Sequence, residues 1–117
     1  MPTIEQLSVM RDTELDALGA RCVGWRTVRS YCDEKGRQFF VHFHPVGDQN
    51  HAFELQEKAC ETSTIRYRNN LLEVCNIDPL AAPIIRDARL IDATARQRTI
   101  AAIATLLAAH DASTTED

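Results

Sequence analysis

Apolar residues recur with a helical period near the start of the chain. At 100° per residue they form one stripe, made of Ile4, Leu7, Leu15, Leu18 and Cys22. Thr3 followed by Gln6 has the spacing of a capping box, and Gly24 suits the left-handed residue that ends a helix. The pattern predicts a helix from Thr3 to Gly24. Because Arg11 interrupts the stripe, a break near Asp12-Thr13 is the alternative.

Two later segments also have a helical pattern. Residues 51–61, HAFELQEKACE, separate an apolar side from a charged side, and Asp48 or Asn50 could cap them. The last element follows a second capping pattern, Thr94 with Gln97, and has an apolar stripe opposite an alanine-rich side. A helix that is apolar on most sides is buried on most sides, so we expect it to lie under a sheet or to meet a second subunit. Residues 111–117 predict a disordered acidic tail.

The remaining pattern indicates β structure. Segments 25–32 and 37–44 flank a turn at 33–36 and predict a hairpin that Pro45 ends. Residues 64–75 predict a second hairpin, which turns at Asn69-Asn70. Residues 77–83 form a connector, and 84–91 fit either a strand or a short helix. The predicted fold is a single α+β domain over residues 1–110, with a small, mostly antiparallel sheet packed by N-terminal, middle and alanine-rich C-terminal helices.

Composition limits the possible functions. The 117 residues suffice for one modest core, and the net charge of −4 argues against nucleic acid as a partner. No apolar run reaches the length of a membrane span, and the first residues lack the pattern of a secretory signal. The four cysteines form no C-x-x-C pair, so free thiols in a reducing cytoplasm are expected.

Two segments carry a family resemblance. ELDALGARCVGW (residues 14–25) resembles the opening helix of the phage ABA-sandwich domain family, which closes on Gly-Trp. DATARQRTIAAIATLLAA (residues 92–109) is similar to the alanine-rich final helix of that family. The resemblance covers the two ends of the chain and the general order of elements. It implies an α+β sandwich and a phage or prophage origin, with the bacterial host cytoplasm as location. It supplies no catalytic residue.

His42 and His44 are the first candidate site. Two imidazoles two residues apart on one strand face can bind the same metal ion, with Cys32 or His51 as a further ligand. The alternative is a strand with one half-solvated face.

Arg66 and Arg68 are the second candidate. On a predicted strand they share a face that could bind a phosphate or a nucleotide, with Trp25 stacking on the ligand. The alternative is a solvated face of ion pairs, with Trp25 as a core anchor.

Motifs for catalysis are missing from the sequence, which has no glycine-rich phosphate loop, no H-E-x-x-H and no G-x-S-x-G. An enzyme is therefore less expected than a binding protein, and no cofactor is indicated. The first functional hypothesis is an accessory protein that binds a host protein or another copy of itself, with the alanine-rich helix as a homodimer contact. A nucleotide or small-molecule binder and a metal-binding protein are the alternatives.

Overall fold

The computed structural model describes residues 2–24, 28–32 and 34–115. Residues 1, 25–27, 33 and 116–117, and therefore Trp25, lie outside the described part. The elements, in chain order, are α1 (Ile4–Ser8), α2 (Asp12–Val23), β1 (Val28–Cys32), β2 (Gln38–His42), α3 (Gln49–Val74), α4 (Pro83–Ile91) and α5 (Ala95–Thr115).

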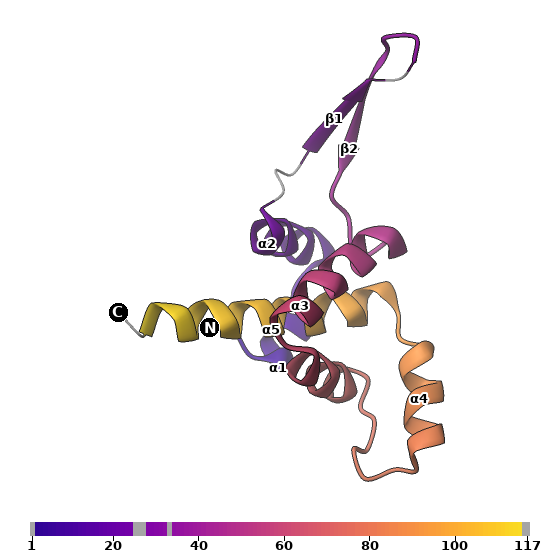
Figure 1. Ribbon diagram of the computed structural model, residues 1–117, viewed down its shortest axis with the longest axis vertical. Helices are drawn as coiled ribbons and strands as arrows, with labels where there is room; N and C mark the ends of the chain where they lie inside the picture. Colours follow the sequence, from indigo (N-terminus) through magenta and orange to yellow (C-terminus); the bar gives the residue numbers. More distant parts are fainter. Residues whose placement is uncertain (1, 25–27, 33, 116–117) are drawn as a thin grey trace.

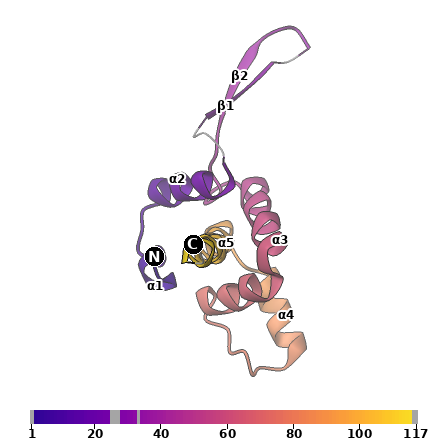
Figure 2. The same cartoon turned by 60° about the vertical axis from the view of Figure 1, so that its left-hand side comes forward.

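Helix α5 is the centre of the molecule, and α1, α2 and α3 surround it, while α4 lies at the outside (Figures 1 and 2). One core cluster joins α5 to α3 through Leu55, Leu71 and Ala102, and a second joins it to α1 and α2 through Leu7 and Leu15. Both clusters take residues from α5, so this helix is buried on more than one side, as its apolar pattern predicts. Its apolar surface meets helices and not a sheet.

The predicted α+β fold is wrong. The structure is 71% helical. The first predicted hairpin is present, since β1 pairs antiparallel with β2 from Val28 opposite His42 to Cys32 opposite Gln38. This two-stranded ribbon projects away from the helices (Figures 1 and 2), and within the described ranges no helix-covered sheet exists. The sandwich that the family resemblance implied is therefore also wrong.

The second predicted hairpin is also wrong, because residues 64–74 continue α3. Tyr67 and Leu71, four residues apart, are buried together against α5, which requires a helical period. Asn70 does not form a turn, and its side-chain Nδ2 donates to the Oγ1 of Thr105 at 3.0 Å. Tertiary packing overrides the local β preference of this segment.

A kink divides α3 at Ser63, whose backbone is extended (φ −163°, ψ 103°). The Ser63 hydroxyl oxygen accepts a hydrogen bond from the backbone N–H of Arg66 at 3.2 Å. It therefore caps the second half of the helix as an N-cap serine does. The kink lets α3 follow the side of α5 as two shorter helices.

The N-terminal region contains a break between two helices, which was the alternative to one continuous helix. The capping box of Thr3 and Gln6 is present, with reciprocal hydrogen bonds of 2.8 and 3.1 Å, but α1 ends at Ser8. α2 then begins at Asp12, directly after Arg11, whose side chain makes no capping hydrogen bond. Gly24 ends α2 with φ 74°, as predicted.

The undecided segment 84–91 is helical, because Pro83 stands in the first turn of α4, where its missing N–H costs no hydrogen bond. The caps at the other predicted helices are as expected: Asp48 caps α3, and Thr94 and Gln97 exchange hydrogen bonds before α5. Helix α5 continues to Thr115, so it includes most of the segment predicted as a tail. Among the residues described, no helix has the length and apolarity needed to cross a membrane.

Candidate binding surface

The outer side of α4 carries an apolar stripe that faces solvent. Ile84, Ala88 and Ile91 fall within about 60° of arc at 3.6 residues per turn, so they line one side of the helix. Ile84 is 79% exposed and Ile91 is 75% exposed, and Leu80 just before the helix is 91% exposed. α4 contains no buried residue. Several exposed apolar residues on one side of a helix make this side a candidate for interaction with another molecule.

The opposite side of α4 holds the helix to the body. Leu90 packs against the core cluster between α3 and α5. The guanidinium of Arg98 donates to the backbone carbonyls of Leu90 (3.1 Å), Ile91 (3.2 Å) and Ala93 (3.2 Å). The carbonyls of Leu90 and Ile91 belong to the last turn of α4, where a cation also complements the helix dipole, and that of Ala93 lies just beyond the helix. Polar anchoring from behind therefore positions α4 with its apolar stripe outward.

Arg98 is itself fixed by neighbouring side chains. Its Nη1 donates to Oε1 of Gln56 at 2.7 Å, and the Tyr67 hydroxyl donates to the same oxygen at 2.7 Å. The guanidinium also lies 5.4 Å from the centre of the Phe53 ring, within cation–π range. The anchor of α4 is thus a network that reaches both α3 and α5.

Arg68 lies beside the exposed end of α4. A hollow of about 280 Å³ separates α4 from α3, and Leu71 and Leu90 line it together with Arg68 and Ile91. The Arg68 side chain is exposed at this hollow. The apolar stripe of α4 therefore continues into a concave region with a basic group beside it.

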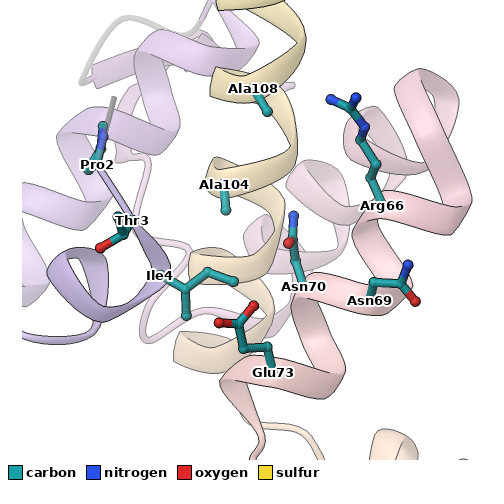
Figure 3. A pocket seen from close by; sticks show the side chains of 9 residues that line it. All are labelled: Pro2, Thr3, Ile4, Arg66, Asn69, Asn70, Glu73, Ala104 and Ala108. Atoms are coloured by element: carbon teal, nitrogen blue, oxygen red, sulfur yellow. The ribbon is translucent and has the colours of Figure 1, made fainter. Parts of the chain in front are cut away.

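Arg66 lies elsewhere, because two residues on a helix are about 200° apart. It lines a different hollow, of about 490 Å³, between α1, the second half of α3 and α5. Figure 3 shows the polar side chains of Arg66, Asn69, Asn70 and Glu73 on the α3 side, with Ile4, Ala104 and Ala108 around the rest. The structure thus separates the predicted Arg66–Arg68 pair and places neither on a strand.

The two candidate metal-binding histidines are also separated by their environments. β2 ends at His42, and His44 lies beyond it in the connection to α3. The Nδ1 atom of His44 contacts the Asp16 carboxylate of α2, and the backbone N–H of His44 donates to Nδ1 of His51 at 3.0 Å. Over the described ranges, no three His, Cys, Asp or Glu side chains are grouped so that they could hold a metal ion.

These contacts indicate a structural role for His44. The same Asp16 carboxylate accepts a hydrogen bond from the backbone N–H of Val46 at 3.1 Å. A Cβ atom added to Gly47 would lie 2.2 Å from Nε2 of His44, so the imidazole packs directly on the glycine backbone. Asp16, His44 and Gly47 together fix the base of the hairpin to α2.

The described thiols have the properties of packing groups. Burial raises the pKa of the Cys22 thiol to about 11, an effect that nearby Arg21 partly offsets. Burial also raises the pKa of Cys60 and of Cys75. A raised pKa leaves little thiolate at neutral pH, the opposite of what a nucleophilic cysteine requires. The side chain of Cys32 lies outside the described part.

Comparisons of the chain with protein-family models, with curated proteins and with solved structures found no match. The interpretation of the site therefore rests on its geometry.

The α4 surface was missed by the sequence reasoning, although its signal was present. Ile84, Ala88 and Ile91 have the spacing of four and three residues that is typical of an amphipathic helix. Pro83 at the start of the segment fits a first helical turn. The sequence does not decide between strand and helix here, because eight residues are too few to establish a period. No sequence pattern tells whether an apolar stripe faces the core or solvent.

Proposed function

We propose that this protein acts by binding another protein chain through the outer side of α4, and not by catalysis. The observation that carries the proposal is the orientation of α4, which has no buried residue and an exposed stripe of Ile84, Ala88 and Ile91. An amphipathic helix that presents anchors at these spacings is one of the recurring modes of protein recognition. The bacterial host cytoplasm is the expected location.

The charge around the stripe favours a protein over a membrane as the partner. Asp87 and Asp92 lie at its two edges, and both are exposed. Helices that lie in anionic membranes carry Lys and Arg at these edges, where they attract the lipid headgroups. α4 is also only nine residues long, and the chain as a whole carries a net charge of −4.

Site-specific photo-crosslinking in the source cells tests the proposal. A benzophenone amino acid replaces Ile84 or Ile91 in turn, and a third variant carries it at Val9, which is 81% exposed and lies at the end of α1. We expect a discrete crosslinked adduct from positions 84 and 91 and none from position 9. The adduct from position 84 should disappear when Ile91→Lys is added. Absence of adducts at both α4 positions would contradict the proposal.

A further inference from the structure

The exposed stripe of α4 and the hollow between α4 and α3 share Ile91, so they adjoin each other on the surface. We infer that two copies of the chain associate through α4, with the helices antiparallel around a two-fold axis near Ala88. This inference rests on the proposed function, because it names the partner of the same surface. It places the dimer contact on α4 and not on the alanine-rich α5.

The apolar residues of the stripe are arranged symmetrically. Ile84 and Ile91 lie about 5 Å along the axis on either side of a point next to Ala88, at a rise of 1.5 Å per residue. A two-fold axis at that point brings Ile84 of one copy against Ile91 of the other, twice. Ala88 then lies at the crossing point, where a small side chain lets the two helices approach closely.

The charged residues beside the stripe are also complementary under this symmetry. Asp87 lies at the edge of the stripe that adjoins the hollow, and Arg68 lies in that hollow, next to Ile91. When two antiparallel helices are related by a two-fold axis perpendicular to them, the edge that carries Asp87 lies on the same side of the interface in both copies. Each Asp87 carboxylate is then within the reach of an Arg68 side chain from the other copy, and the pairing occurs twice.

Within one copy these groups are available for such a contact. Among the ion pairs of the described residues, none joins Asp87 or Arg68 to another side chain. The other charges of the helix lie farther away. Asp92 stands at the end of α4, about 13.5 Å along the axis from its symmetry mate, which exceeds the screening length in physiological salt. Arg89 lies about 130° around the helix from the stripe.

The size of the surface sets the expected strength. A nine-residue helix and one adjoining hollow make an interface at the small end of specific contacts, so we expect a weak dimer with a dissociation constant of about 100 µM. The association should weaken with added salt, because the Asp87–Arg68 pairs are exposed.

Sedimentation velocity of the full chain, from about 20 to 500 µM, tests the inference. We expect the wild type to shift from monomer to dimer over this range. Ile91→Lys should weaken the dimer at least about ten-fold, because it places a charge in the apolar contact. Val9→Lys is the matched control, since it adds the same charge at an exposed apolar residue on another part of the surface, and it should leave the dimer unchanged.

A charge exchange tests the two-fold arrangement itself. Asp87→Arg alone brings Arg against Arg68 in both pairs, and Arg68→Asp alone brings Asp against Asp87 in both pairs, so each variant should be monomeric. Mixing the two variants creates two attractive pairs and should restore a heterodimer. If either substitution acted only within its own chain, mixing the two variants would not restore a dimer.

The other outcomes overturn the inference in distinct ways. A wild type that stays monomeric at about 500 µM removes the second copy as partner, and crosslinking from position 84 then decides whether α4 binds a different protein. A dimer that survives Ile91→Lys places the contact elsewhere on the chain. A dimer that Ile91→Lys breaks, but that mixing the charge variants does not restore, refutes the pairing of Asp87 with Arg68.

Discussion

Helices α4 and α5 are neighbours in the chain, yet they use their apolar residues in opposite ways. α5 has apolar residues on most sides and lies at the centre of the molecule, with Ile103 fully buried. α4 has one apolar side and turns it to solvent, with Ile84 79% exposed. The comparison teaches that an apolar pattern predicts that a surface will be covered, but not by which chain. In α5 other parts of the same chain cover the apolar residues, whereas in α4 they stay exposed, and we propose that a second chain covers them.

Two arginines of α5 make a second part of the comparison. Arg98 holds the end of α4 through its carbonyl groups. Arg96 holds the turn between α1 and α2, where its Nη2 donates to the carbonyls of Ser8 (3.0 Å) and Met10 (2.8 Å) and its Nη1 contacts the Asp12 carboxylate. Two residues apart, the side chains leave α5 in different directions. The central helix thus anchors both flanking segments by polar contacts, while its apolar residues form the core.

The largest expected difference between the two helices is in the free energy of unfolding. Ile103→Ala should lower it by about 3 to 4 kcal/mol, because the side chain is fully buried and its removal leaves a cavity. Ile84→Ala, the same substitution on α4, should change it by less than about 0.5 kcal/mol in the monomer. Urea unfolding at low micromolar protein concentration, below the range of association, measures both. Equal losses would show that α4 is packed in solution.

Removal of the anchor should come next in size. Arg98→Met keeps most of the side-chain volume but leaves the carbonyls of Leu90, Ile91 and Ala93 without their donor, at a cost of about 2 kcal/mol. Hydrogen exchange should show that the amides of α4 lose protection. Arg96→Met is the matched control, since it should release the turn between α1 and α2 and leave α4 protected. Loss of protection in α4 in both variants would contradict separate anchoring.

The sequence predicted the parts of the fold that depend on local chemistry. The capping pairs of Thr3 with Gln6 and of Thr94 with Gln97 are present, as are the left-handed Gly24 and the hairpin of β1 and β2. Each depends on residues within a few positions, so the necessary information lies in one short segment.

The parts that failed depend on residues distant in sequence. Residues 64–74 have β-prone side chains, but Tyr67 and Leu71 pack against α5, which lies about thirty residues later in the chain. Only a helix places both side chains on the side that faces α5. The expected shared face of Arg66 and Arg68 is absent for the same reason, since two residues that are two positions apart share a side on a strand but not on a helix. The α4 surface could not be assigned because the sequence does not show which apolar stripe the body leaves uncovered.

Loss of a helix cap should have a smaller effect. Thr94→Ala removes the acceptor for the backbone N–H of Gln97, now bonded at 3.1 Å, and should lower the free energy of unfolding by about 1 kcal/mol. Thr3→Ala makes the same change before α1, a helix of only five residues, and should lower it less. Urea unfolding compares the two variants. A larger loss at Thr3 would mean that α1 contributes more to the core than its length suggests.

The smallest expected effect is a pH dependence at Cys22, where α2 faces the end of α5. Its thiol lines a hollow with Leu18 and Leu106, and burial raises its pKa from 9.0 to about 11. The folded state thus favours the neutral thiol, so the stability linked to this group is complete below pH 9.0 and is lost as the pH rises through about 11. Cys22→Ala should reduce the fall in the free energy of unfolding over that interval. Cys60 and Cys75 also have raised pKa values, so part of the fall should persist in the variant. If the free energy of unfolding fell equally with pH in the wild type and in Cys22→Ala, the thiol would be as accessible to water in the folded chain as in the unfolded one. The end of α5 beside Cys22 would then be less completely covered than the part around Ile103.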